Sequence, residues 1–274
     1  AAVTLVLDNI SLKEVGVATG WTTADAEPLI PQTALMGMSK PMVFDGIDDS
    51  SDQYAESDTD DDLFPDNAYW SVSCWVKFDD YNQSNASAID DGIWLFPNEL
   101  KLNNDGGTLK VFAESSLSIN NYFGSAITSN DLYHIVVVYD GTLSGNTNRI
   151  KLYLNGTQLT STEDNGTIPA TLGAAGKKIR IGADHIWGTA AHTGIINEIA
   201  LFKSSLTLAD CQTIFNDGVP YDVTSYSGIQ NYWRNTGSTT WNDLVGGGDA
   251  GTMNLTVNGS PETLLLPEGT TSGK

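Results

Sequence analysis

The chain has 274 residues, and 34 acidic against 13 basic side chains give it a formal net charge of −21. So much negative charge repels phosphate groups, which argues against nucleic acid and against anionic membranes as partners. Carboxylate oxygens are the ligands that calcium prefers, so these acids could bind that ion or could serve solubility alone. No apolar run of about eighteen residues predicts a transmembrane span, and the first residues lack the basic start of a signal peptide.

The first 40 residues are expected to form a strand and an extended arm. Val3 to Val15 alternates apolar and polar residues, as a strand with one exposed face does. Leu7 to Val15 also resembles the closing strand of a carbohydrate-binding jelly-roll module. That leaves two interpretations, a strand of the present domain or the end of an upstream one. Gly16 to Pro41 includes two further prolines and has weak periodicity, which predicts a linker or a surface arm.

Short alternating segments between residues 41 and 257 predict a set of β-strands. In Ser71 to Phe78, alternation puts the apolar residues from Val72 to Phe78 on one face and Trp75 on the other. Ile135 to Tyr139 is a continuous apolar run, which is typical of a strand covered on both faces. Further strands are expected at 93–96, 100–102, 109–112, 117–119, 150–154, 179–182 and 195–202, with tight turns at Asn103 to Gly107 and at Asn155-Gly156.

One helix is predicted, at Thr207 to Phe215. Thr207 can cap it, and Asp210 three residues later approximates a capping box. The predicted buried stripe of the helix consists of Leu208, Cys211, Ile214 and Phe215. The other cysteine, Cys74, lies in a predicted strand; separate buried thiols are expected, although a bridge between the two stays open.

The order of these elements resembles the laminin-G-like domains of the concanavalin A-like lectin and glucanase superfamily. The resemblance implies an all-β fold, an antiparallel two-sheet jelly-roll sandwich with one short helix, over residues 41–257, followed by a C-terminal tail at 258–274. The matching motifs are Phe-Asp-Gly-Ile-Asp-Asp at 44–49, Ser-Cys-Trp-Val-Lys at 73–77, His-Ile-Val-Val-Val-Tyr-Asp-Gly at 134–141, Leu-Tyr-Leu-Asn-Gly at 152–156 and Gly-Ile-Ile-Asn-Glu-Ile at 194–199.

Catalytic patterns are missing from the sequence. Glucanases of this superfamily carry Glu-x-Asp-x-Glu, which places the carboxylates on one face of a strand, whereas Glu198 stands alone. His134, His185 and His192 have neither a nucleophile elbow nor zinc-ligand spacing nearby, and a structural role is expected for His134. We therefore predict that the chain is not an enzyme, and keep a glycoside hydrolase as the remaining alternative.

Calcium is the cofactor that the sequence suggests. The resemblance implies a calcium ion at the rim of the sandwich, near Asp45, Asp48 and Asp49, with Glu198 or Asn197 brought close by the neighbouring strands. An alternative cluster has carboxylates at alternate positions, although it lacks the glycine and the distal glutamate of an EF-hand. This second cluster, which could equally be a solvated acidic loop, consists of Asp58, Asp60 and Asp62.

Two functions follow from the resemblance. A glycan-binding adhesion module would stack sugars on exposed aromatic rings, for which Trp94, Tyr122 and Trp187 are candidates unless they pack in the core. A structural or display subunit would instead assemble with other protein subunits through the arm at residues 16–40. The arm and the Leu-Pro-Glu-Gly segment near the end resemble surface or tail-fibre proteins of bacteriophages, which implies a virion surface or an extracellular location. We favour assembly over glycan binding.

Overall fold

The computed structural model describes residues 41–46, 53–57, 68–81, 91–96, 100–113, 120–172, 178–184, 190–235, 238–246 and 253–263. Several sequence predictions lie outside these residues: the N-terminal strand and arm, the strand at 117–119, His185, and most of the C-terminal tail. The same holds for five candidate calcium ligands (Asp48, Asp49, Asp58, Asp60 and Asp62) and for the candidate sugar platform Trp187.

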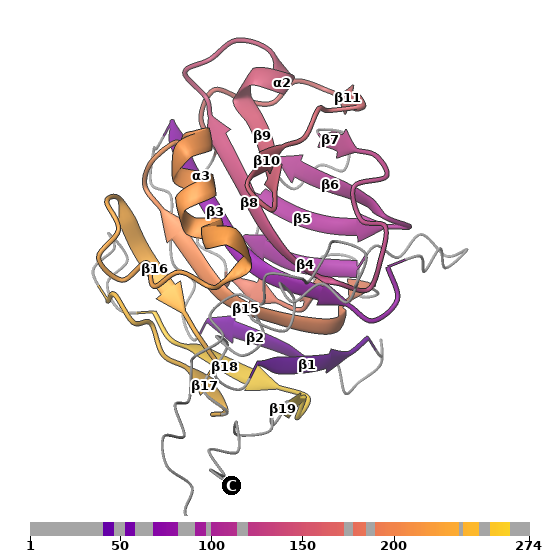
Figure 1. Cartoon of the computed structure of the whole chain (residues 1–274), viewed down its shortest axis with the longest axis vertical. Coiled ribbons are helices and arrows are strands. Elements are labelled where there is room, and N and C mark those ends of the chain that lie inside the picture. Colours follow the sequence, from indigo (N-terminus) through magenta and orange to yellow (C-terminus); the bar gives the residue numbers. More distant parts are fainter. Residues whose placement is uncertain are drawn as a thin grey trace, which may run out of the picture.

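The described chain folds into two antiparallel β-sheets packed face to face (Figure 1). In the eight-stranded sheet the order is β10-β9-β8-β3-β15-β1-β19, with β16 also paired to β15. The elements of this sheet are β10 (Thr157–Gln158), β9 (Ile150–Leu154), β8 (Leu132–Asp140), β3 (Tyr69–Phe78), β15 (Thr193–Phe202), β1 (Met42–Asp45), β19 (Glu262–Thr263) and β16 (Ile229–Trp233).

The nine-stranded sheet has the order β11-β7-β6-β5-β4-β12-β2-β18-β17. Its elements are β11 (Glu163–Asn165), β7 (Asn120–Phe123), β6 (Thr108–Ala113), β5 (Leu100–Asp105), β4 (Asp91–Phe96), β12 (Arg180–Ile181), β2 (Tyr54–Ser57), β18 (Leu255–Asn258) and β17 (Thr240–Trp241). The remaining elements are the hairpin β13 (Ala183–Asp184) and β14 (Ala190–Ala191), α2 (Asn146–Arg149), α3 (Leu208–Phe215) and the 3-10 turn η1 (Asn216–Gly218).

The alternation predicted for β3 is confirmed. Val72, Cys74, Val76 and Phe78 lie in the main core between the sheets, whereas Trp75 faces the other side and packs on Leu132 and Phe215. Strand β8 is covered on both faces, as its continuous apolar run predicts: its odd-numbered residues from Ile135 to Tyr139 enter the main core, while Val136 and Val138 pack under α3.

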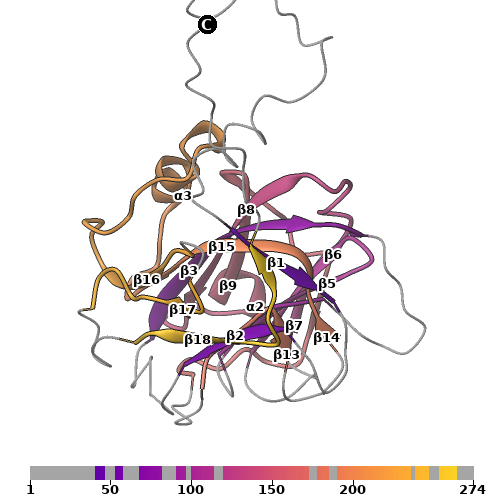
Figure 2. The ribbon, with the colours of Figure 1, turned by 90° about the horizontal axis from the view of Figure 1, so that it is seen from below.

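Helix α3 covers the outer face of the eight-stranded sheet and lies on the far side of that sheet from β2 and β18 (Figure 2). The capping box is confirmed: the Thr207 side chain accepts a hydrogen bond from the Asp210 N–H, and the Asp210 carboxylate accepts one from the Thr207 N–H. The prediction that Leu208 belongs to the buried stripe of the helix is wrong, because this side chain is 44 % exposed. Spacing identifies the buried face of a helix, but not how far along the helix the contact with the sheet extends.

The turn predicted at Asn155-Gly156 is confirmed, and the turn predicted at Asn103 to Gly107 is shorter than expected because residues 103–105 belong to β5. Asn155 and Gly156 have φ of 49° and 72°, the positive values that a two-residue turn between antiparallel strands requires, and they join β9 to β10. The β5–β6 hairpin turns at Gly106 and Gly107. At the other end of the chain, β19 pairs with β1, so strands of the sandwich continue beyond Val257, where we expected it to end.

Cys74 and Cys211 are both buried, and they do not form a disulfide with each other. They lie on opposite faces of the eight-stranded sheet, Cys74 in the main core and Cys211 under α3, so the expectation of separate thiols is confirmed. Among the described residues, no helix is long and apolar enough to cross a membrane.

Candidate functional site

The outer face of the nine-stranded sheet carries a polar and aromatic row. Alternation along β2 and β12 sends Ala55, Ile179 and Ile181 into the core. The residues between them therefore point outward, and antiparallel pairing sets Glu56 beside Arg180 on one side and beside Thr256 of β18 on the other. The outward side chains of this row, which we name the β2–β12 face, are Tyr54, Glu56, Lys178, Arg180, Thr256 and Asn258.

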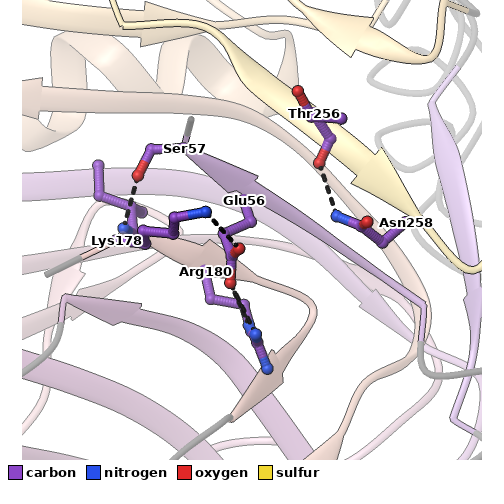
Figure 3. Close-up of polar contacts among 7 residues, drawn as sticks. Glu56, Ser57, Lys178, Arg180, Thr256 and Asn258 are labelled. Atoms are coloured by element: carbon purple, nitrogen blue, oxygen red, sulfur yellow. Dashed lines mark hydrogen bonds and ion pairs between the residues drawn. The ribbon is translucent and has the colours of Figure 1, made fainter. Parts of the chain in front are cut away.

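Glu56 is the centre of the β2–β12 face (Figure 3). Its Oε2 accepts hydrogen bonds from Arg180 Nε at 3.1 Å and Nη2 at 2.6 Å, and its Oε1 accepts one from Lys178 Nζ at 3.2 Å. Burial alone would raise the pKa of Glu56, but the hydrogen bonds and charges of Arg180 and Lys178 outweigh it and leave the pKa lowered. The carboxylate therefore stays ionised at neutral pH and holds both cations.

Arg180 is also held from below by an aromatic ring. Its guanidinium carbon lies 3.9 Å from the centroid of the Tyr54 ring, within the range of a cation–π contact. The backbone around it is fixed as well, because the Ile179 N–H donates to Ser57 Oγ at 3.0 Å and the Ser57 N–H donates to the Ile179 carbonyl at 3.1 Å. The guanidinium plane is thus oriented by a carboxylate, a ring and a strand pair.

Two further pairs of a cation and an aromatic ring lie across the same face of the sheet. Lys101 of β5 lies with its Nζ 4.8 Å from the centroid of Phe112, and Lys110 of β6 lies 5.2 Å from the centroid of Tyr122 on β7. Lys110 also bonds to Asp105 at 2.5 Å. Lys101 is only 6 % exposed. Its positive charge therefore acts on a ligand at this face through long-range electrostatic attraction and not through direct contact.

The candidate sugar platforms are placed as follows. Tyr122 is half-buried on the outer face of the nine-stranded sheet, with Lys110 against its ring. The backbone of Trp94 lies in β4, paired with Leu102 and Ile181, two positions at which the neighbouring strands bury apolar side chains. Of the three candidates, the structure therefore places Tyr122 on the same sheet face as Arg180.

Glu198 does not lie with Asp45. Asp45 pairs with Thr193 at one end of β15. Glu198 comes five residues later, about 16 Å further along at a rise of about 3.3 Å per residue. Asn197 is engaged elsewhere, since its Oδ1 accepts a hydrogen bond from the Asn235 N–H at 2.8 Å. The expected calcium set of Asp45 with Glu198 is therefore corrected: strand register separates these two members.

Glu198 instead belongs to a buried ion pair. It is 4 % exposed, sits at the bulge where β15 changes register against β3, and has φ of 54°. Its Oε1 accepts from Arg234 Nε at 2.6 Å, and its Oε2 accepts from the Tyr232 hydroxyl, which itself accepts from Arg234 Nη2 at 2.7 Å. Burial raises the pKa of Glu198, and Arg234 and Tyr232 offset part of that rise.

The described residues contain no group of three or more His, Cys, Asp or Glu side chains arranged to hold a metal ion. Asp45 is the described member of the first candidate cluster, and its backbone N–H donates to Gln53 Oε1 at 2.9 Å. Calcium binding by the remaining acids stays a prediction.

The two described histidines are packed in the interior. His134 Nε2 lies 2.8 Å from Ser73 Oγ, its ring contacts Trp75 and Phe215, and burial lowers its pKa to about 3. The structural role expected for His134 agrees with this position. His192 Nε2 lies 3.2 Å from the Lys77 carbonyl, and burial lowers its pKa to about 4. Both rings are neutral at pH 7, and the Ser73 hydroxyl that His134 contacts is itself buried.

Sequence reasoning missed the β2–β12 face. The strands that carry it, Tyr-Ala-Glu-Ser at 54–57 and Lys-Ile-Arg-Ile at 178–181, each alternate outward polar with inward apolar or small residues, and that alternation was the available signal. The meeting of Glu56 with Arg180 depends on pairing between segments 124 residues apart, which no local pattern gives.

Comparison with known families agrees with this architecture. Residues 49–212, more than half of the chain, match the model of a laminin-G family described as the concanavalin A-like lectin/glucanases superfamily. The chain therefore belongs to this superfamily. A comparison with curated protein sequences finds no significant match.

One solved structure shows the same fold at low sequence identity. A candidate carbohydrate-binding protein from Bacteroides ovatus is 16 % identical, with a TM-score of 0.57 over 84 % of this chain and 61 % of that protein. The chain thus spans less than two thirds of that protein's length. A heptameric SAP-like pentraxin from Limulus polyphemus is also 16 % identical, with a TM-score of 0.49 over 73 % of this chain and 94 % of the pentraxin.

Proposed function

We propose that the chain is a non-catalytic carbohydrate-binding module and that its ligand lies on the β2–β12 face. The observation that carries the proposal is the composition of that face, which combines the Tyr54 ring, an oriented guanidinium and a carboxylate with the neighbouring residues Thr256 and Asn258. Figure 3 shows Glu56, Lys178 and Arg180 with Thr256 and Asn258 on the adjacent strand. Sugars are bound by such sets, because ring faces take their C–H groups while planar polar groups take their hydroxyls. The likeness to the Bacteroides ovatus protein supports the same class of ligand.

The arrangement of carboxylates in the described strands supports a non-catalytic role. Glycoside hydrolysis needs two carboxyl groups that flank one bond, and in the described strands no two carboxylates alternate on one face. The carboxylate of Glu198, the residue that a glucanase reading would use, is already bonded to Arg234 and Tyr232 inside the fold. Release of reducing sugar from a glycan that the protein binds would show glycoside hydrolysis and contradict the non-catalytic role.

A glycan array followed by calorimetry tests the proposal. We expect at least one glycan to bind, and Tyr54→Ala and Arg180→Gln to weaken that binding. Lys151→Gln is the control, because Lys151 lies on β9 of the other sheet and the substitution removes the same charge. Loss of binding in all three variants, or in none, would contradict the assignment of the site.

The display or assembly role on a virion or other extracellular surface depends on residues 16–40, which lie outside the described part of the chain. It stays a prediction, and deletion of residues 1–39 tests it. If the full chain is oligomeric in solution and the truncated chain is monomeric, the arm is an assembly element. Unchanged oligomeric state after the deletion would remove the reason for favouring assembly.

A further inference from the structure

The nine-stranded sheet carries a local charge opposite to that of the whole chain. Four of the 13 basic residues, Lys101, Lys110, Lys178 and Arg180, point to its outer face. Strand register puts three acidic residues on that face: Glu56, Asp105, and Glu163, which pairs with Tyr122. Four minus three leaves a surplus of one positive charge among these residues, whereas the complete chain carries −21.

Local charge decides which ligand approaches this face. At physiological salt the screening length is about 8 Å, so acids elsewhere on the molecule are largely screened from a ligand bound between β2 and β6. Lys110 on β6 and Arg180 on β12 lie three strand spacings apart, about 15 Å. An extended ligand with several negative charges can reach both cations, whereas a single small anion cannot.

Arg180 still has donors to offer. Of its five N–H groups, one on Nε and one on Nη2 donate to Glu56 Oε2. The remaining three have no partner among the described residues. The Arg180 side chain is 15 % exposed and its neighbour Lys178 is 41 % exposed, so a ligand can reach both. A planar guanidinium fixed on a ring is the group best suited to bind a carboxylate through two parallel bonds.

We propose that the ligand is an acidic glycan, a polysaccharide of uronic acids, and that Arg180 and Lys178 bind one of its carboxylates. This proposal rests on the carbohydrate-binding function proposed above. Glu56 holds the side chains of Arg180 and Lys178 next to each other, and its negative charge offsets part of their positive charge. Tyr54 provides the base on which the guanidinium lies and an apolar edge for the sugar ring.

The test compares each polysaccharide with its own neutralised form. Polygalacturonate, alginate and hyaluronan are titrated into the full chain as sodium salts and as methyl esters, at two salt concentrations. We expect one of the salts to bind and its ester to bind at least tenfold more weakly, because the ester lacks the charge that strengthens the hydrogen bonds from Arg180 and Lys178. The affinity for the salt should fall as sodium chloride is raised, because dissolved ions screen the attraction.

Variants locate the contact. Arg180→Gln should weaken binding of the acidic form roughly tenfold or more and leave binding of the ester unchanged. Arg180→Lys keeps the charge beside Glu56 and the ion pair, so it should fold as the parent does and still lose affinity, because it lacks the planar fork. Lys151→Gln is the control with unchanged affinity. Thermal melting of each variant shows that folding is intact.

The outcomes separate this inference from the function on which it rests. If a neutral glycan or an ester binds as well as the acid, and Tyr54→Ala abolishes that binding, the acidic class is overturned while the carbohydrate-binding function stands. If an acidic glycan binds equally to the parent, Arg180→Gln and Arg180→Lys, the assignment of Arg180 is overturned. If neither acidic nor neutral glycans bind, both proposals fail.

Discussion

The ion pair between Glu198 and Arg234 gives the sharpest test of the packing. Glu198 is 4 % exposed, and both of its oxygens are bonded, to Arg234 Nε at 2.6 Å and to the Tyr232 hydroxyl. Arg234→Met removes the positive charge but keeps an unbranched side chain that can still cover the Tyr232 ring. The variant therefore leaves a carboxylate buried without its counter-ion.

The expected loss is about 2–4 kcal/mol in the free energy of unfolding at pH 7. Removing one partner of a buried pair costs about 3–5 kcal/mol. The Arg234 side chain is 24 % exposed, so water replaces part of the lost interaction and the expected loss lies about 1 kcal/mol below that range. In the double variant Glu198→Gln, Arg234→Met no buried charge remains, and we expect it to recover more than half of the loss.

The loss should depend on pH in a defined direction. Burial holds the pKa of Glu198 above its ordinary value of 4.5, so the folded protein binds this proton more tightly than the unfolded chain does. The free energy of unfolding therefore falls as pH rises through the window above 4.5, and without Arg234 the window extends to higher pH. The cost of Arg234→Met should be largest at pH 7 and smaller near pH 5.

Urea unfolding at pH 7 and pH 5 measures these differences, with Lys151→Met as a control that removes an equal charge from the other part of the same sheet. A loss below about 0.5 kcal/mol at pH 7, the usual size of a surface substitution, would refute the assignment of a buried pair. So would a loss that is equal at the two pH values.

Three further predictions concern the helix cap, the buried histidines and calcium. Thr207→Ala removes the cap of α3 and should cost about 1 kcal/mol in urea unfolding, a loss that Thr207→Ser should largely avoid. His134 and His192, whose pKa values burial lowers to about 3 and about 4, should stay neutral by NMR down to about pH 5. Because the unfolded chain takes up these protons below pH 6.5, they should make the protein less stable as pH falls, and imidazole titration near pH 6.5 would contradict their burial. Calcium should raise the melting temperature and EDTA should lower it, with Asp48→Asn or Asp60→Asn reducing the effect according to which cluster binds; a melting temperature that neither changes would exclude calcium binding.

Local patterns predicted the sandwich because its strands alternate strictly. Val72 to Phe78 could be assigned to faces from sequence, since period two leaves no choice once one face is buried. The cap at Thr207 and the turn at Asn155 were predictable for the same reason, because each depends on residues within a few positions. Leu208 was not, because its exposure depends on where the helix lies over the sheet.

The candidate site could not be predicted in the same way. Glu198 bonds to a side chain 36 residues away, and its separation from Asp45 follows from strand register, which the sequence does not state. Glu56 and Arg180 are ordinary charged residues of short strands until β2 and β12 pair. Their significance comes from long-range pairing between strands, whereas motif reasoning looked for carboxylates and aromatic rings close together in the chain.

The most direct test of the central claim is a crystal structure of the chain with the oligosaccharide that binds most tightly in the glycan array. The account predicts a sugar on the outer face of the nine-stranded sheet, in contact with Tyr54 and with a hydrogen bond from Arg180. A sugar bound elsewhere, such as at the rim beside Asp45 or next to α3, would contradict it.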